Sequence, residues 1–287
     1  MTNRASLTAG YMALFRALES RRPPKERLFS DPYAPVFLRG WRTWLYRAAR
    51  FRAGLRFAEA VLDHSAPGAR AAGIARTKWL DDEATLALRT ADQLVLLGAG
   101  FDMRAHRLPA AARATVFELD HPLTSRAKQE SLRNIATPPR VRYVAIDFAR
   151  ESITEVLRQA GFEYARPACF IWEGVTNYLT AEAIDSTLRQ IRRTAAGNLL
   201  LFTYIHRGVL DRPQQFFGAA KMIARLQSYG EPWTFGLYPE ELETYLASRG
   251  FALVKDLGVE EVWRETRRSN AGTRGYEFYR LAAARVS

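Results

Sequence analysis

Short apolar runs alternate with longer amphipathic segments from residue 90 onward. Strands that alternate with helices in this way are typical of a parallel sheet joined by crossover helices. We predict strands at 94–97, 115–119, 141–146, 168–172, 198–204, 251–254 and 276–281, with helices at 122–133, 151–160, 181–195, 211–228 and 239–249. Because no helix is predicted between the last two strands, the pattern indicates an α/β fold: a Rossmann-like, doubly wound, seven-stranded and mostly parallel sheet with an antiparallel last strand.

The first 80 residues have a helical pattern, with Tyr11, Leu14 and Leu18 at helical spacing. A second helix is predicted from 41 to about 62, with an apolar stripe that comprises Trp44, Leu45, Ala48, Phe51, Leu55, Ala58 and Val61 or Leu62. The arginines of this segment lie largely off the stripe. Such a helix either packs on its own domain or lies on an anionic membrane, and we favour packing. We therefore predict an N-terminal helical cap at 1–80, packed on a domain that spans 81–287.

The segment 206–236 lies between two predicted strands and is too long for a plain connection. It carries the large side chains of Phe216, Phe217, Met222 and Trp233. We predict that it forms a helical lid, or an insertion that faces a substrate.

Basic residues are concentrated in the predicted cap. Residues 1–80 contain 15 Lys and Arg against 5 Asp and Glu, so most of the net charge of +12 lies there. This distribution supports a rival hypothesis, a nucleic-acid-binding or RNA-modifying protein that uses the basic cap. No base-stacking motif accompanies the charge, so we expect no nucleic-acid partner.

The strongest local motif is a glycine turn after the first predicted strand. Gly98, Ala99 and Gly100 follow the apolar run 94–97, and Asp102 comes next at the start of a helical segment. Glycines at this point let the backbone approach a ligand closely. The third glycine of the dinucleotide fingerprint is missing, which disfavours NAD. A tight turn with Asp102 as helix cap and no ligand is the alternative interpretation.

Acidic residues follow the next three predicted strands as well. Asp120 comes after Leu119, and Asp147 and Glu173 end the two strands after that. Ligands of open α/β sheets bind outside these carboxyl ends, so the acids and Asp102 are predicted to converge on one crevice. Each alone is as well explained by a helix cap or a surface ion pair. Together, they would repel one another without a ligand, and they suit a cationic ligand without phosphate, such as S-adenosylmethionine.

Several segments resemble the leucine carboxyl methyltransferase-like group of class I methyltransferases, whose bacterial branch includes natural-product O-methyltransferases. The resemblance spans nearly the whole chain and implies a fold and an activity. The matching segments are RLFSDPYA at 27–34, ARTKWLDD at 75–82, LGAGFDMRAHRLP at 97–109, FELDHP at 117–122, WEGVTNYL at 172–179, EPWTFG at 231–236 and PEEL at 239–242.

The resemblance implies S-adenosylmethionine as the cofactor, bound by the domain at 81–287 together with Arg76. In the family's pattern Arg76 would meet the carboxylate of the cofactor, Asp120 its ribose, and Asp147 with Phe148 its adenine. Glu173 and the glycines would face the methionine part. The implied cofactor-binding residues are Arg76, Gly98, Ala99, Gly100, Asp102, Leu119, Asp120, Asp147, Phe148 and Glu173. We expect no metal.

Methyl transfer from a sulfonium is an in-line displacement in which the enzyme mainly aligns the reactants and excludes water. A carboxylic acid is already ionised at neutral pH and needs only orientation, whereas a phenol or alcohol needs a base, most naturally a histidine. We predict that His206, Tyr204 and Tyr178 contact the acceptor. The predicted activity is O-methylation of a carboxylate or hydroxyl of a small molecule, a natural-product intermediate being one such acceptor; a non-catalytic scaffold with the same fold is the alternative.

Residues 1–6 lack the apolar segment of a signal peptide, and no run approaches the roughly 20 apolar residues of a membrane span. The single cysteine, Cys169, lies in an apolar run and is expected to be a packed thiol. We therefore expect a cytoplasmic protein with a small-molecule substrate and no membrane partner. The oligomeric state is left open.

Overall fold

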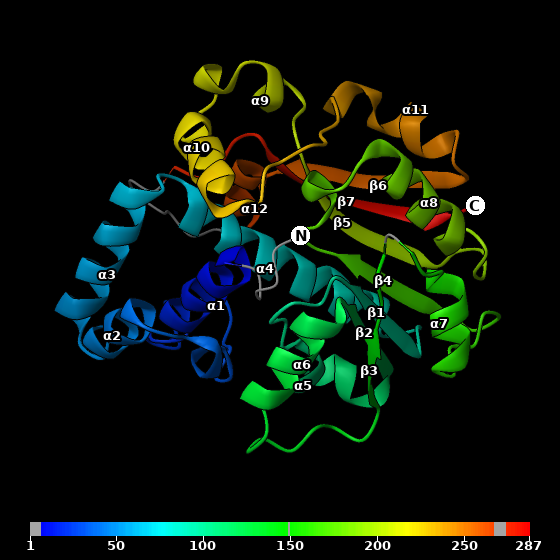
Figure 1. Ribbon diagram of the computed structural model, residues 1–287, viewed down its shortest axis with the longest axis horizontal. Coiled ribbons are helices and arrows are strands. Elements are labelled where there is room, and N and C mark those ends of the chain that lie inside the picture. The colour runs from blue at the N-terminus through cyan, green and yellow to red at the C-terminus, as the bar shows by residue number, and fades with distance from the viewer. Residues whose placement is uncertain (1–6, 149, 267–273) are drawn as a thin grey trace.

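The protein is built around one seven-stranded sheet (Figure 1). The computed structural model describes residues 7–148, 150–266 and 274–287, so residues 1–6 of the predicted cap lie outside the described part. The strands are β1 Gln93–Leu97, β2 Thr115–Asp120, β3 Val141–Ala145, β4 Ala168–Trp172, β5 Leu199–Ile205, β6 Phe251–Gly258 and β7 Tyr279–Val286. Their order is β3-β2-β1-β4-β5-β7-β6, with β1 to β5 parallel and β7 antiparallel to both of its neighbours. The predicted doubly wound fold with an antiparallel last strand is confirmed.

Helices cover both faces of the sheet. Successive residues of β1 point to opposite faces: Leu94 and Leu96 pack in the core with α1, α4 and α12, while Val95 and Leu97 pack in the core with α7, α8 and α11. Within the described ranges, none of the helices combines the length and apolar character needed to cross a bilayer. The helices are α1 Leu7–Glu19, α2 Trp41–Ala48, α3 Arg52–Ser65, α4 Ala69–Ala87, α5 Arg104–Arg107, α6 Pro122–Ser131, α7 Ile153–Gln159, α8 Ala181–Ile191, α9 Gly208–Asp211, α10 Ala219–Tyr229, α11 Leu242–Ala247 and α12 Val259–Glu265.

The structure corrects the prediction for the end of the chain. A helix, α12, lies between β6 and β7, where none was predicted, and it buries Val259 and Val262 against α4. The last strand begins at Tyr279 and not at Tyr276, because the aromatic run at 276–278 forms an irregular segment in which the rings of Tyr276 and Phe278 stack at 4.6 Å. An alternation of aromatic residues that looks like a strand is here a packed connection.

The helix predicted from 41 to about 62 is two helices, α2 and α3, with a break at 49–51. Gly54 permits the sharp turn, because a Cβ at this position would lie 1.9 Å from the backbone oxygen of Ala48. The apolar stripe is also only partly packed: Leu45 is buried, whereas Trp44 and Phe51 are each 62% exposed. The predicted boundary at residue 80 stays a prediction, and α4 runs across it.

The segment 206–236 forms α9 and α10 in place of one predicted helix at 211–228, and it meets the first helix of the chain (Figure 1). The backbone N–H of Leu7 and the hydroxyl of Thr8 donate to the carboxylate of Glu231, each at 2.9 Å. The hydroxyls of Tyr11 and Tyr229 lie 3.1 Å apart. We call these five residues the α1–α10 roof, because they join the predicted cap to the predicted lid.

Gly98→Ala is expected to lower the free energy of unfolding by about 2 kcal/mol more than Gly161→Ala. Both glycines have a positive φ, +68° and +88°, so both substitutions carry the backbone penalty of about 1 kcal/mol. Only at Gly98 would the new Cβ lie 2.6 Å from Cγ2 of Val175; at Gly161 no described atom lies within 4 Å. Urea unfolding measures the difference, and Val175→Ala should restore the loss in the Gly98→Ala background. Equal losses for the two alanine variants would contradict the crowding argument.

Candidate active site

The candidate site lies where the strand order reverses, at the carboxyl ends of the neighbouring strands β1 and β4. After β1 the backbone N–H groups of Gly98 and Ala99 both donate to the carbonyl of Leu119, at 2.9 and 3.0 Å, which fixes the glycine turn on β2. Gly100 has a φ of +50°, and a Cβ there would meet nothing in the described chain closer than Ala9 of α1, at 3.8 Å. The turn therefore leaves room beside Gly100, under the first turn of α1.

Asp120, at the end of β2, borders this space. Its carboxylate accepts hydrogen bonds from the backbone N–H of Gly100 and, at 2.6 Å, from that of His121. Burial raises the pKa of Asp120, although the two N–H groups act in the opposite direction. Each carboxylate oxygen accepts one of these bonds and keeps a second lone pair, so Asp120 is able to accept two further hydrogen bonds, as a diol would donate.

Glu173, which follows β4, is held by two arginines. Arg76 of α4 donates from Nε to one carboxylate oxygen at 2.7 Å, and Arg104 donates from Nη1 to the other at 2.6 Å. Arg104 also binds the carboxylate of Asp102. Nη1 of Arg76 donates to the hydroxyl of Tyr279 at 2.8 Å. For Asp102 and Glu173 the expectation of unpaired carboxylates that repel one another is therefore wrong, because Arg104 lies between them.

The arginine and carboxylate pairs continue behind the site as a buried network. Arg104 donates from Nε to Asp81 at 2.8 Å, and Arg107 donates to the same carboxylate at 2.6 Å. Arg16 pairs with Asp31 at 2.9 Å and donates to the backbone oxygen of Phe101 at 2.6 Å. Asp81, Arg104 and Arg107 were not predicted as site residues, although all three lie in the matching segments. No local pattern marks them, because Asp81 is followed by Asp82 and Glu83, and Arg104 and Arg107 lie in the mixed polar run DMRAHR at 102–107.

Asp102 provides a pH dependence of stability. Burial alone would raise its pKa, but Arg104, Arg107 and Lys128 outweigh burial and lower the pKa of Asp102 to about 2. A carboxyl whose pKa is lower in the folded state stabilises the fold above its unfolded pKa, and this contribution is lost as the pH falls through the folded pKa. Between pH 5 and pH 2 the free energy of unfolding of the unaltered protein should therefore fall by about 2 kcal/mol more than that of the Asp102→Asn variant. Urea unfolding of both proteins at the two pH values measures this difference. Equal losses of stability in the two proteins would show that Asp102 is not held ionised by the arginines.

The two residues assigned to the adenine lie at the edge of this arrangement. Asp147 follows β3 with its side chain 36% exposed, and its backbone N–H donates to Glu151 at 2.8 Å. Phe148 is partly buried against the core beneath α7 and α8. The structure places both on the same sheet edge as Asp120, and their role at the adenine stays a prediction.

The three residues predicted to contact the acceptor have different surroundings. Tyr178 is close to Tyr279 at the Arg76 side of the site, and burial raises the pKa of its hydroxyl to about 12. His206 follows β5; its Nδ1 accepts a hydrogen bond from the backbone N–H of Gly208 at 3.0 Å, and its ring lies 5.2 Å from that of Phe216. Burial lowers the pKa of His206.

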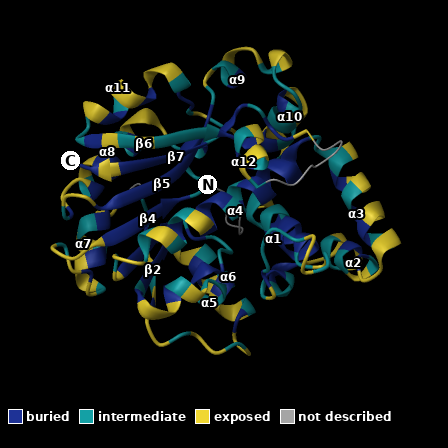
Figure 2. Cartoon of the chain, turned by 180° about the vertical axis from the view of Figure 1, so that it is seen from behind, coloured by how far each residue is buried: buried dark blue, intermediate teal, exposed yellow. Residues whose placement is uncertain are grey.

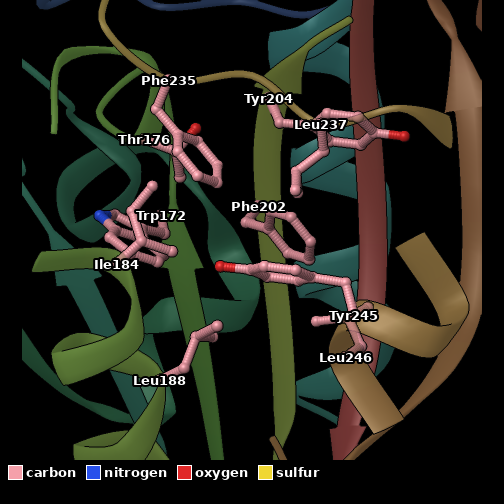
Figure 3. Close-up of a pocket in the computed structure, with 10 residues that line it drawn as sticks. All are labelled: Trp172, Thr176, Ile184, Leu188, Phe202, Tyr204, Phe235, Leu237, Tyr245 and Leu246. Carbon is pink, nitrogen blue, oxygen red and sulfur yellow. The ribbon is translucent and has the colours of Figure 1, made fainter. Parts of the chain in front are cut away.

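The structure separates Tyr204 from the other candidates. Its side chain lies on the opposite face of the sheet, among residues that line a pocket covered by α8 and α11 (Figure 3). The hydroxyl points towards the last two strands, where it donates to Asp256 of β6 at 2.9 Å and accepts from Arg280 of β7 at 3.1 Å. The pocket has a volume of about 10 Å³, enough for one water molecule and not for an acceptor.

Comparison with known proteins identifies the family. The family model described as leucine carboxyl methyltransferase matches residues 9–192. The chain belongs to the leucine carboxyl methyltransferase family. It is 33% identical over 273 residues to a protein of Mycobacterium tuberculosis strain H37Rv, covering 88% of this chain and 75% of that one. It is 31% identical over 288 residues to a protein of Mycobacteroides abscessus, covering 93% and 90%. Both relatives are named as candidate S-adenosyl-L-methionine-dependent methyltransferases.

Solved structures share the fold at low sequence identity. A structure described as a candidate methyltransferase from Thermobifida fusca has a TM-score of 0.63 at 17% identity, covering 100% of this chain and 96% of that one. A DUF574 family protein from Streptomyces avermitilis has a TM-score of 0.60 at 16% identity, covering 82% and 91%. With the family established, the protein is an S-adenosylmethionine-dependent methyltransferase and S-adenosylmethionine is its cofactor.

The residues of the site fit this cofactor. A ribose diol suits the two free acceptor positions of Asp120, and the space beside Gly100 is one that a Cβ would fill. A sulfonium cation suits the carboxylate of Glu173, and an amino-acid carboxylate suits the guanidinium of Arg76. The donor set therefore matches a cationic ligand without phosphate.

Proposed function

We propose that the protein methylates a carboxylate oxygen of a small organic molecule, with a hydroxyl as the second candidate acceptor. Aromatic rings support an apolar acceptor, because they form a continuous series of contacts from His206 through Phe216, Phe278 and Trp233 to Tyr279, next to Arg76. Natural-product pathways supply acids of this kind. The proposed setting is the cytoplasm, and a lone buried cysteine is typical of reducing compartments.

A carboxylate acceptor is favoured by the protonation states of His206 and Tyr178, the two predicted contact residues that a general base would have to come from. His206 has a lowered pKa and is neutral at pH 7, and because Nδ1 accepts from Gly208 its proton lies on Nε2. In this tautomer Nε2 donates a hydrogen bond, and the lone pair on Nδ1, which a general base would use, accepts the N–H of Gly208. The hydroxyl of Tyr178, with a pKa raised to about 12, is likewise a donor. Two donors and no base suit an acceptor that is already ionised.

When bound, the cofactor would supply a methyl group on a positively charged sulfur: the acceptor oxygen would bond to the methyl carbon in line as the carbon–sulfur bond breaks, and the sulfur would keep the bonding pair as a neutral thioether. Glu173, fixed by Arg76 and Arg104, offers a negative charge at the sulfonium end of the site. Tyr178 and His206 orient the acceptor oxygens through their hydroxyl and Nε2–H groups. The α1–α10 roof holds the first turn of α1 beside Gly100, where it would help to keep water from the reacting groups.

The pH profile of kcat tests this proposal. With a carboxylic acid as acceptor, kcat should be flat from about pH 6 to pH 9, because the acid is ionised throughout this range. His206→Gln, which keeps a donor, should raise KM about threefold or less, and His206→Ala about tenfold, with kcat little changed. Methyl ester formation is followed by mass spectrometry over matched acids, phenols and alcohols. A kcat that rises with pH, together with turnover of phenols alone, would overturn the carboxylate proposal and leave the methyltransferase assignment intact.

A further inference from the structure

The surface of α2 and α3 exposes a concentration of large apolar side chains. Nine large apolar residues are exposed in the described part of the chain, and five of them lie in or between these two helices. They are Trp41 at 48%, Trp44 at 62%, Phe51 at 62%, Phe57 at 52% and Val61 at 38% exposure. We call this surface, with the arginines beside it, the α2–α3 face.

The same helices bury a separate apolar side, so the exposed rings are not a consequence of poor folding. Leu45, Leu55, Ala58 and Leu62 are all at most 8% exposed and belong to the core that contains α1 and α4. α2 and α3 form the periphery of the molecule, and α3 carries exposed residues along its outer side (Figures 1 and 2). The helices are therefore supported on one side and present a second apolar surface on the other.

The α2–α3 face is continuous across the two helices. The rings of Trp44 and Phe57 lie 6.4 Å apart in an edge-to-face arrangement, which joins α2 to α3. Phe57 and Val61 are one turn apart on α3 and form a ridge. Both rings still expose apolar surface to water, and covering that surface with an apolar phase is favourable.

The charge of the α2–α3 face is predominantly positive. Arg47, Arg50, Arg52 and Arg56 are exposed, and residues 41–58 contain no Asp or Glu; Arg52 makes an exposed ion pair with Glu26 at 3.1 Å. The guanidinium of Arg50 lies over the ring of Phe51, 4.5 Å from its centroid, so cation and aromatic ring share one site. The acids next in the chain are directed elsewhere: Glu59 and Asp63 both pair with Arg70.

We propose that the α2–α3 face docks the protein on the surface of a lipid bilayer that contains anionic headgroups. On such a surface, aromatic side chains lie at the boundary of headgroups and acyl chains, and arginines bind the phosphates beside them. A second copy of the chain is disfavoured because a two-fold contact would bring these arginines together. Nucleic acid would match the charge, but it leaves the ridge of Phe57 and Val61 exposed. The proposal replaces the expectation that this stripe packs on the protein and that no membrane partner exists.

The test is co-sedimentation of the full-length protein with phosphatidylcholine vesicles, with and without phosphatidylglycerol. We expect binding only to the anionic vesicles, reduced by high salt. Trp44→Ser with Phe57→Ser, and separately Arg47→Gln with Arg56→Gln, should each weaken the partition constant about tenfold or more. All four positions are exposed, so the unfolding transition should be unchanged.

Matched controls alter exposed apolar and basic residues elsewhere on the surface. Leu86 and Val254 are 51% and 54% exposed on other elements, and Leu86→Ser with Val254→Ser should leave vesicle binding as it is. Arg133→Gln with Arg189→Gln, both exposed, should do the same. Equal weakening by a control pair, or no binding to anionic vesicles, overturns the proposal. So does a complex with RNA or DNA that survives the aromatic substitutions, or a stable dimer in sedimentation that the same substitutions dissociate.

Discussion

Replacing Asp120 by alanine is expected to weaken the binding of S-adenosylmethionine by about 100-fold. Two hydrogen bonds from a ribose to a carboxylate would be lost, and the backbone N–H of Gly100 would lose its acceptor at the same time. Hydrogen bonds to a charged acceptor contribute about 1.5–3 kcal/mol each, so the loss of two accounts for a factor of at least about 100. Isothermal titration calorimetry with S-adenosylmethionine and S-adenosylhomocysteine measures it, with NAD as the ligand that should not bind.

The control for Asp120 lies at the other end of the neighbouring strand. Asp92 precedes β1, at the opposite edge of the sheet, and its carboxylate is 52% exposed in an ion pair with Arg166. Asp92→Ala should leave the affinity for the cofactor unchanged. An affinity of Asp120→Ala within about threefold of the unaltered protein would remove Asp120 from the binding site.

Arg104→Met is expected to lower the free energy of unfolding by about 3–5 kcal/mol. The guanidinium is 1% exposed and binds the carboxylates of Asp81, Asp102 and Glu173. Methionine fills much of the volume but leaves three carboxylates short of a cation, and an uncompensated buried charge is costly. Urea unfolding at neutral pH provides the measurement. Because Glu173 loses one of its two arginines, the affinity for S-adenosylmethionine should fall as well.

A surface arginine with two acidic partners is the control that separates the effect of burial from the effect of losing a charge. Arg166 pairs with Asp92 at 2.6 Å and with Glu163 at 3.0 Å, and it is 49% exposed. Arg166→Met should cost less than about 1 kcal/mol, because exposed ion pairs are well solvated when broken. In the Arg104→Met background, Asp102→Asn should recover part of the stability by removing one of the unpaired charges. A loss for Arg104→Met no larger than that for Arg166→Met would contradict the role of the buried network.

The central sheet was predictable because its strands are buried on both faces. β4 has the bounds that the apolar run at 168–172 predicts, since a parallel strand covered on both sides is apolar throughout. The cap was less predictable. The stripe continues in phase from α2 into α3, so periodicity alone does not reveal the break that Gly54 permits. Periodicity also does not distinguish a side packed on the protein from one that faces outward.

Site contacts between residues at the ends of adjacent strands were predictable. Contacts that depend on which charged side chains pair with each other were not. The contact of Gly100 with Asp120 follows from adjacent parallel strands. The contacts of Arg104 join residues 23 and 69 positions away, which no local pattern specifies. The prediction for Tyr204 was wrong because successive side chains of a strand point to opposite faces of the sheet. The side chain of Thr203 accepts a hydrogen bond from the backbone N–H of Gly174 beside the site, so Tyr204 points to the other face.

The α1–α10 roof gives the first helix of the chain a part in turnover. The first turn of α1 lies beside Gly100, and it is tied down through Thr8 and Leu7 to Glu231. Contacts of this kind are worth about 1 kcal/mol each, so they open and close on the microsecond to millisecond timescale of loop motions. If the spent cofactor leaves past this turn, we expect these contacts to break first. The frequency of that opening would then set an upper limit on how often one molecule completes its catalytic cycle.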